Sequence, residues 1–589
     1  MYVAVHQPMK VSKLMRKKEN PSKHPFPRPV IAWILVFCVI QTACSAIAPP
    51  SQSSPGGNNT PNPPVQTPTQ MNDFQIVAAN KSAFEYDFAE FNIGSGVYQS
   101  KTSAHQMPYE IRGIMAVPKG AGPFPIVLIS HGNHEELDQS KRLDTGFDYL
   151  VKGLAEKGYI AISMDMLKPY IQSFGGNDDY IEKMTAVAND HIDGLLAANG
   201  GNSGLFPIDL VGKIDFDRLA LIGHSRSGAA IFQIGAELLS KDLTVKSYLS
   251  LAPAADFWAR FQDASIAFLV PQYDGDVIQL DGIFMFDYLA GRFKGDHSLT
   301  VLMGANHNFF NRNIERDDSS SHQAENGHPP MTREEQEAFL VNFATAFLDS
   351  SLGQRDSFYL TGQPQPNKMF GHYVNRVLRM NGSLDLIKPD STAGFTALGA
   401  SVRHAVDSVF YNSDELLVNT ATTSILKTIL DGTFDKEDDT FEYLAVNRDL
   451  IVIEWTNNNS SVKITPSISD FSSSRSLTIH IIPDSASELN KQGEALRFSI
   501  LLCDSSGNSA SISCAPGQMA LTPYAGKHEK TVISDDFIIE YWSPTTPMGM
   551  LNIPLSSFNG VDLSSIMSVE LIFDQSTNGS LFLGGIQLQ

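Results

Sequence analysis

Apolar and polar positions are patterned differently along successive parts of the chain. Residues 45–71 are mostly Ser, Pro, Asn, Gly, Gln and Thr and hold few apolar side chains. From residue 72 to 353 short apolar runs alternate with helical patterns, and residues 354–394 are less regular. Over 395–589 apolar and polar residues alternate with a period of two. We therefore predict a disordered linker, a domain of alternating strands and helices, a connecting segment and an all-β domain.

The domain at 72–353 contains two kinds of strand pattern. "FEYDFAEFNI" and "YEIRGIMAVP" alternate with period two and predict antiparallel strands. "PIVLIS", "RLALIG" and "IAFLVPQ" are continuous apolar runs, which is typical of strands buried on both faces of a parallel sheet. Helical segments such as "TREEQEAFLVNFATAFLDSSLG" lie between or after them. The alternation predicts the α/β class, with a doubly wound, mostly parallel sheet.

A serine in the segment "IGHSRSG" follows one of these apolar runs and precedes a helix. This strand-to-turn-to-helix setting is the one that presents a nucleophilic serine, and it makes Ser225 the candidate. Close packing of the strand and the helix needs small residues two positions before and after the serine. Gly223 meets this need and Ser227 only approximates it, because a glycine is expected there.

An acid and a histidine follow in the order that such a serine requires. His307 comes after a late strand in "VLMGANHNFF", and the acid lies between them in "PQYDGDV". We assign Asp274 as the acid, with Asp276 as the alternative. The set Ser225, Asp274 and His307 predicts a nucleophile, an orienting acid and a general base.

The oxyanion of such a reaction needs two hydrogen-bond donors. The backbone N–H of Arg226, directly after the serine, is one. The second is expected from the loop "SHGNHEE", at Asn133. This loop also holds His131, His134, Glu135 and Glu136, but the histidine pair four residues apart of a zinc helix is missing, so we predict no metal.

Together, "FPIVLISHGN", "GYIAISMDM", "LALIGHSRSG", "PQYDGDV" and "GANHNFF" resemble the α/β-hydrolase superfamily, nearest its dienelactone-hydrolase, acetylhydrolase and cutinase-like branch. The resemblance covers residues 72–353. It implies an α/β-hydrolase fold and a serine esterase that needs no cofactor. Its substrate would be a carboxylic ester, either polymeric or linked to a glycan.

The C-terminal region is similar to jelly-roll sandwiches that accompany secreted carbohydrate-active enzymes. The resemblance implies that aromatic side chains on one face can stack on sugars, and Trp455, Tyr541 and Trp542 are the candidates. Aromatic residues of a sandwich usually pack in its core, however, and this is the interpretation that we favour for them. Two other hypotheses follow: an esterase directed at acetyl or uronate groups of glycans, or a non-catalytic surface binding protein. The acidic run at 435–439 predicts a solvated loop, because it lacks the ligand spacing of a calcium loop.

Residues 1–44 carry basic residues, then the apolar run Val30 to Ile40, then "QTACS". The run is shorter than the ~20 residues of a membrane span, so it predicts a signal peptide and export. Its end resembles a bacterial lipoprotein signal, which implies lipid attachment at Cys44 as the membrane contact. Gln41 departs from that pattern, so simple secretion stays an alternative.

The cysteines and the net charge limit the partners further. Of four cysteines, Cys503 and Cys514 lie outside the signal and flank a turn-rich stretch, which predicts a disulfide in an oxidising compartment. The formal net charge of −21 makes a nucleic-acid partner unfavourable. The long polar insert at 311–331 follows His307 and is expected to border the substrate cleft.

Overall fold

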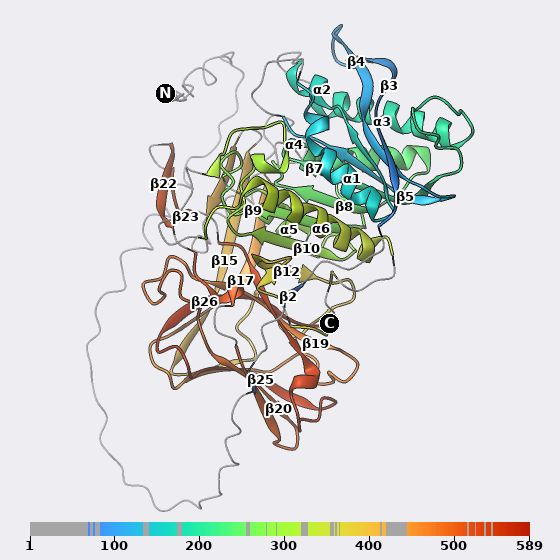
Figure 1. Ribbon diagram of the computed structural model, residues 1–589. Coiled ribbons are helices and arrows are strands. Elements are labelled where there is room, and N and C mark those ends of the chain that lie inside the picture. Colours follow the sequence, from blue (N-terminus) through green and yellow to red (C-terminus); the bar gives the residue numbers. More distant parts are fainter. Residues whose placement is uncertain are drawn as a thin grey trace, which may run out of the picture. The chain divides into compact units, whose positions relative to one another are not determined.

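The structure is a computed structural model of the whole chain (Figure 1). It describes residues 83–589 and the short strands at 69–70 and 75–76, apart from residues 134–140, 173–178, 255–259, 279, 290, 320–327, 354–357, 360–361, 365, 413–414, 420–443, 515–517, 525, 535–536 and 544–545. The chain consists of two compact units, Met1–Val65 and Gln66–Gln589, and all described residues belong to the second unit. The predicted signal peptide, lipid anchor Cys44, most of the linker and the acidic run at 435–439 lie outside the described residues.

The first part of this unit forms an 11-stranded sheet in the order β2-β11-β12-β10-β9-β8-β7-β5-β6-β4-β3. Its strands are β2 (Gln75–Ile76), β3 (Tyr86–Gln99), β4 (Gln106–Pro118), β5 (Phe124–Ser130), β6 (Ile160–Met164), β7 (Ile214–His224), β8 (Val245–Leu251), β9 (Ser265–Pro271), β10 (His297–Leu302), β11 (Lys368–Met369) and β12 (His372–Arg379). The buried apolar runs of the sequence form β5 to β10, and each pairs in parallel with its neighbours in this group.

The predicted fold class, a doubly wound and mostly parallel sheet of the α/β-hydrolase fold, is wrong. The sheet is mixed: β3, β4 and β6 are joined by antiparallel pairings at one end, and β10, β12 and β11 at the other. The structure is 37% strand and 22% helix, with large antiparallel and mixed sheets among the residues that it describes. The alternation of strands and helices described the centre of one sheet and missed how much of the chain pairs in antiparallel fashion.

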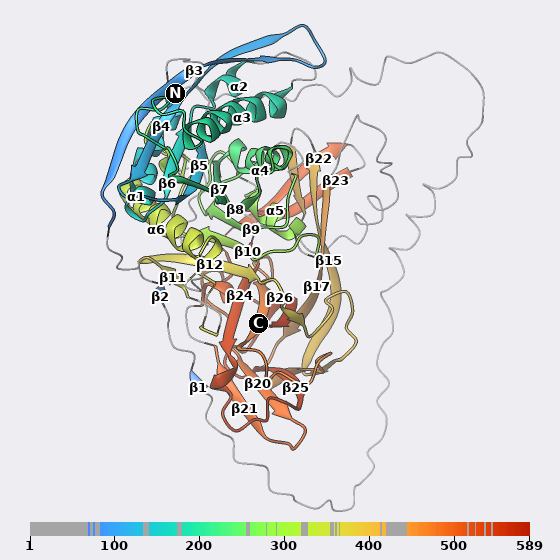
Figure 2. The same cartoon turned by 90° about the vertical axis from the view of Figure 1, so that its right-hand side faces the viewer.

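Helices pack on the parallel centre of this sheet (Figure 2). They are α1 (Asp148–Glu156), α2 (Leu167–Ile171), α3 (Tyr180–Asn199), α4 (Arg226–Leu238), α5 (Gly282–Leu289) and α6 (Arg333–Ser351). Helix α6 begins with a capping box, in which the Thr332 side chain accepts from the N–H of Glu335 and the Glu335 carboxylate accepts from the N–H of Thr332. Helices α1 and α6 contact each other, as do α3 and α4.

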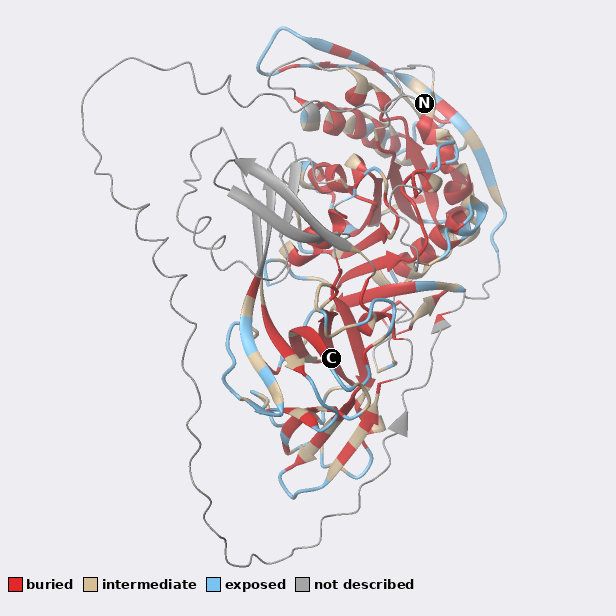
Figure 3. Ribbon diagram, turned by 90° about the vertical axis from the view of Figure 1, so that its left-hand side faces the viewer, coloured by how far each residue is buried: buried red, intermediate tan, exposed pale blue. Residues whose placement is uncertain are grey.

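Two further sheets and a hairpin make up the C-terminal part. The six-stranded sheet holds β1 (Thr69–Gln70), β14 (Phe395–Leu398), β18 (Ser460–Ile464), β20 (Ser499–Asp504), β21 (Ser509–Ser513) and β25 (Ile566–Phe573). The seven-stranded sheet holds β13 (Leu384–Asp385), β15 (Ala400–Asn412), β16 (Glu415–Asn419), β17 (Leu444–Trp455), β19 (Ser476–Pro483), β24 (Gly549–Pro554) and β26 (Gly579–Leu588), and β22 (Lys527–Ser534) pairs with β23 (Phe537–Ser543). Side chains of the six-stranded and the seven-stranded sheet form one apolar core, and Figure 3 shows their buried strands.

Trp455, one of the three aromatic candidates for sugar stacking, is buried. Trp455 is 1% exposed, its ring stacks on Phe573 with centroids 3.9 Å apart, and its Nε1–H donates to the carbonyl of Ser576. Trp455 is therefore a core residue, which is the interpretation that the sequence favours, and its ring is not available to stack on a sugar. The side chains of Tyr541 and Trp542 lie outside the described residues.

The predicted disulfide is also wrong, because Cys503 and Cys514 are free thiols. They lie on the hairpin of β20 and β21, where Cys503 faces Ser509 and Ser499 faces Ser513. Cys514 thus lies at the far end of the hairpin, about five residues or ~16 Å from Cys503. A disulfide needs Cα atoms closer than about 7 Å. Burial raises the pKa of Cys514 to about 12, which keeps this thiol protonated.

A buried histidine joins the seven-stranded sheet to β12. His480 is 3% exposed and its Nε2–H donates to the carbonyl of Leu378 at 3.1 Å. Burial, with a smaller contribution from the charge of Arg379, lowers the pKa of His480 to about 3. The ring is therefore neutral in the folded state at every pH above about 3.

We expect the free energy of unfolding to fall as the pH drops below 6.5, because His480 binds a proton in the unfolded chain but stays neutral in the folded protein. The slope for one such histidine is up to about 1.4 kcal/mol per pH unit. His480→Gln keeps a donor for Leu378 and does not titrate, so its urea midpoint should fall less than that of the wild type between pH 7 and pH 5. Equal losses in the two proteins would contradict the assignment.

In the part of the chain that the structure describes, no helix is long and apolar enough to cross a membrane.

Candidate active site

Ser225 occupies a strained turn between β7 and α4. Its φ of 59° and ψ of −129° lie in a region that residues with a side chain rarely adopt. The turn is fixed by three backbone bonds: the N–H of Ser225 donates to Leu251, and its carbonyl accepts from Gly228 and Ala254. A strained serine held this way at the end of a buried strand is the geometry of a nucleophile elbow.

The small residues around the elbow explain why position 227 tolerates a serine. A Cβ on Gly223 would lie 2.1 Å from the carbonyl oxygen of Ser227, and one on Gly228 would lie 2.7 Å from the Cβ of Pro253. Glycine is thus required at 223 and 228. Ser227 is fully buried, and its hydroxyl donates to the carbonyl of His131 at 2.6 Å. Its side chain therefore packs against the loop that contains His131 and bonds to it.

Asp274 and His307 form a buried pair next to β9 and β10. The Oδ2 of Asp274 lies 3.0 Å from the Nδ1 of His307, and both side chains are almost fully buried. The Oδ1 of Asp274 accepts from the N–H of Val277 at 2.6 Å and of Asp276 at 3.1 Å. One oxygen is thus held by the backbone, and the other faces the ring. With Nδ1 donating to Asp274, the neutral ring carries its lone pair on Nε2.

Asp276, the alternative acid, lies on the other side of the ring. Its Oδ2 is 3.5 Å from the Nε2 of His307, and its side chain is about half exposed. The nitrogen that an orienting acid must hold therefore faces Asp274. Asp276 instead places a negative charge beside the nitrogen that exchanges protons.

These carboxylates set the proton affinity of the ring. Burial acts to lower the pKa of His307, but the charges of Asp274, Asp276 and Asp318, with the hydrogen bond from Asp274, outweigh it and raise the pKa to about 9. The ring is therefore protonated more readily at neutral pH than a free imidazole.

We expect any reaction that uses neutral His307 as its base to speed up with pH until about pH 9. Asp276→Asn removes one of the raising charges, so its kcat/KM profile should reach its plateau at a lower pH than the wild type. The measurement is kcat/KM from pH 6 to pH 10 for both proteins. A wild-type plateau already at pH 7 would contradict the raised pKa.

Asp318, in the polar insert after His307, ties the acid loop to the histidine loop. Its Oδ2 accepts from the N–H of Gly275 at 2.7 Å and of His307 at 3.3 Å, and its Oδ1 accepts from the N–H of Asn308 at 3.0 Å. Gly275 directly follows Asp274. One 5% exposed carboxylate therefore fixes the backbone beside both members of the pair. No sequence pattern in the insert distinguished this residue from the adjacent Asp317.

Asp318→Asn should lower kcat by about 10 to 100 fold, because charge-assisted bonds to three amides are weakened and both loops lose their common anchor. It should also lower the pKa of His307, since one raising charge is lost. Asp317→Asn is the matched control, because Asp317 accepts from Asn306 and Ser319 without contacting the pair. Equal losses of kcat in the two variants would refute the anchoring role.

The predicted oxyanion loop lies against the elbow. A Cβ on Gly132 would lie 2.4 Å from the Cβ of Ser225, so the backbone of the loop approaches the serine as closely as only glycine permits. Asn133 follows directly, and Arg226 is the first residue of α4. Asn133 is thus next to the glycine that approaches Ser225, and Arg226 is next to Ser225 itself. The metal ligands considered at 134–136 lie outside the described residues.

His131 uses both ring nitrogens inside this loop. Its Nε2 accepts from the N–H of Met166 at 2.8 Å, so the ring proton is on Nδ1, which donates to the carbonyl of Gly132 at 2.8 Å. A ring engaged in this way is a structural histidine of the loop.

His224 directly precedes Ser225, and no sequence pattern predicted a role for it. Its Nε2–H donates to the carbonyl of His307 at 3.1 Å, and the two rings are 4.7 Å apart between centroids. The elbow is thereby linked to the histidine loop.

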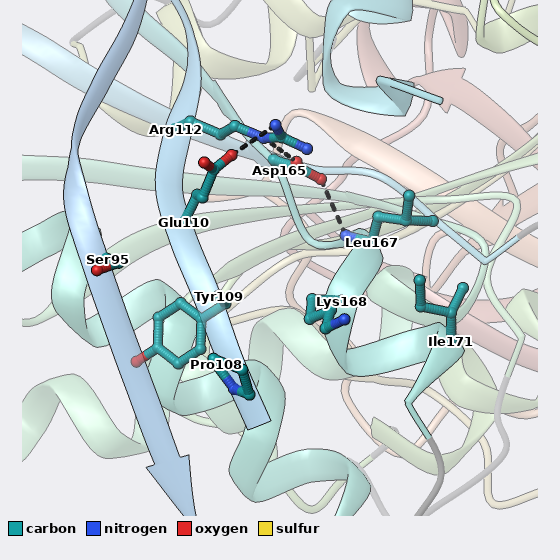
Figure 4. A pocket seen from close by; sticks show the side chains of 9 residues that line it. All are labelled: Ser95, Pro108, Tyr109, Glu110, Arg112, Asp165, Leu167, Lys168 and Ile171. Atoms are coloured by element: carbon teal, nitrogen blue, oxygen red, sulfur yellow. Dashed lines mark hydrogen bonds and ion pairs between the residues drawn. The ribbon is translucent and has the colours of Figure 1, made fainter. Parts of the chain in front are cut away.

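A pocket of about 390 Å³ is lined by residues of β3, β4 and α2 (Figure 4). It is lined by Ser95, Pro108, Tyr109, Glu110, Arg112, Asp165, Leu167, Lys168 and Ile171. The guanidinium of Arg112 donates to Glu110 and to Asp165, each at 2.6 Å, as Figure 4 shows. Asp165 in turn lies 3.6 Å from the ring of His131. Arg112, Glu110 and Asp165 are engaged with one another, so these three charges single out no class of ligand.

The sequence matches no family model and no curated protein.

Proposed function

We propose that the protein is a serine hydrolase that cleaves carboxylic esters through an acyl-enzyme. The observation that carries this proposal is the combination of a strained serine at an elbow with a buried Asp274–His307 pair whose loop is bonded to the residue before that serine. A binding scaffold would not need a strained serine, an oriented imidazole and a glycine loop at one place.

The geometry supports the following roles. Ser225 Oγ attacks the ester carbonyl carbon while His307 Nε2 takes its proton, and Asp274 keeps the imidazolium oriented. The N–H groups of Asn133 and Arg226 receive the charge that develops on the carbonyl oxygen. The C–O bond to the alcohol then breaks and His307 protonates the leaving alkoxide. Water repeats the sequence on the acyl-enzyme, which releases the acid and restores Ser225. These steps use only groups of the chain and water.

The substrate class is proposed at the level of the ester bond. Sugar recognition by Trp455 has no support, because this side chain is buried. From the N-terminal pattern we also propose that the protein is exported, with Cys44 as the site of lipid attachment.

The direct test is turnover of p-nitrophenyl esters from acetate to decanoate by the full chain. We expect hydrolysis, fastest at alkaline pH. A wild-type protein that hydrolyses none of these esters and reacts with no fluorophosphonate would instead support the non-catalytic binding hypothesis.

A further inference from the structure

The serine at the position where a glycine is expected belongs to a buried chain of hydroxyl groups. The Ser227 hydroxyl donates to the carbonyl of His131 at 2.6 Å, so its oxygen is left to accept from the Tyr170 hydroxyl, 2.5 Å away. The Tyr170 hydroxyl also lies 3.2 Å from the same carbonyl. Ser227 is in α4 and Tyr170 in α2. Ser227 of α4 therefore binds the carbonyl of the oxyanion loop directly, and Tyr170 of α2 supports the Ser227 hydroxyl.

The next peptide of this loop is fixed from the other side. The Nδ1–H of His131 donates to the carbonyl of Gly132. In a trans peptide the C=O and the following N–H point in opposite directions. With the Gly132 carbonyl turned to the imidazole, the N–H of Asn133 points away from it. The orientation of the proposed oxyanion donor thus depends on where His131 is held.

We propose that Ser227, supported by Tyr170, is a positioning residue that locks the oxyanion loop to the nucleophile elbow. Ser227 lies two residues after Ser225 and bonds to a residue two before Asn133. The hydrogen bond from Ser227 to the carbonyl of His131 therefore fixes the position of the oxyanion donor relative to the nucleophile. This inference rests on the proposed function.

The test compares two alanine variants of the full chain. Ser227→Ala removes the bond to the oxyanion loop. Ser250→Ala is the matched control, since Ser250 is also buried and its hydroxyl donates to a backbone carbonyl of the same helix, Gly228, at 2.8 Å. The two variants lose equivalent bonds, but only the first one loosens the loop.

Ser227→Ala should lower kcat by about 10 to 100 fold with little change in KM, because a donor displaced from the oxyanion acts on the transition state. Its affinity for a trifluoromethyl ketone, which forms an oxyanion on the serine, should fall by the same factor. Tyr170→Phe should have a smaller effect of the same kind, and the two losses should not add in the double variant. Ser250→Ala should keep the wild-type kcat and inhibitor affinity.

Hydrogen exchange gives a readout that does not depend on turnover. The amides of residues 131–133 should exchange faster in Ser227→Ala than in Ser250→Ala. Unchanged kcat and exchange in Ser227→Ala, or equal losses in Ser250→Ala, would overturn the positioning role while the wild type still hydrolyses esters. A wild type without turnover would overturn the proposed function, and this inference with it.

Discussion

Ser225→Ala is expected to lower ester turnover by about 10⁴ fold or more, because the reaction loses its nucleophile and keeps only the groups that bind the substrate and the oxyanion. The fold should be unaffected, since alanine removes one oxygen from a backbone held by bonds to Leu251, Gly228 and Ala254. The measurement is kcat for a p-nitrophenyl ester together with the thermal midpoint.

Ser240→Ala is the control for this variant. Ser240 is exposed in the turn directly after α4, where its hydroxyl donates to Glu237. It should retain wild-type turnover. A Ser225→Ala protein with more than about a hundredth of the wild-type rate would show that another group attacks the substrate.

Asp274→Asn should lower kcat by about 10³ to 10⁴ fold, close to the loss from Ser225→Ala. The amide that replaces the carboxylate presents an NH₂ or an uncharged oxygen to the Nδ1 of His307. The first forces the ring proton to Nε2, where it blocks the transfer from the serine, and the second no longer stabilises the imidazolium. The measurement is kcat/KM as a function of pH. We expect the value for Asp274→Asn to stay below that of the wild type even at alkaline pH.

Asp276→Asn separates the two acids. Asp276 faces Nε2 at 3.5 Å, not Nδ1, so its variant should stay active and reach its plateau at a lower pH. If Asp276→Asn lost more activity than Asp274→Asn, the roles of the two carboxylates would have to be exchanged.

The sequence predicted local elements well and long-range pairing poorly. The apolar runs before Ser225, Asp274 and His307 are strands, since burial on both faces leaves a continuous apolar pattern. Helix α6 begins next to Thr332, within a residue of the predicted start. The antiparallel pairing of β3 with β4 agrees with their period-two patterns. The fold class was nevertheless wrong, because the antiparallel pairing of β4 with β6 and of β10 with β12 joins segments whose patterns do not encode their neighbours.

The disulfide prediction failed for a related reason. Eleven positions separate Cys503 from Cys514, and that spacing fits a closed loop as well as an open hairpin. Only the register, which sets Cys503 against Ser509, excludes the bond.

The candidate site was partly accessible from the sequence. Ser225, Asp274, His307 and Asn133 each follow a strand, which is where side chains of a parallel sheet meet. Ser227, Tyr170 and Asp318 act through bonds to residues 96, 39 and 43 positions away in the chain. Such bonds have no local pattern, so only coordinates could assign these residues. Membership in the α/β-hydrolase superfamily stays a prediction.

Covalent trapping addresses the proposed nucleophile without reference to any substrate. The full chain is incubated with a fluorophosphonate, digested with trypsin and mapped by mass spectrometry, with Ser225→Ala in parallel. We predict one phosphonyl group per chain, on Ser225, formed faster as the pH rises toward 9 and absent from the variant. A wild-type protein that hydrolyses esters yet carries no adduct on Ser225, or carries it on another serine, would contradict the assignment.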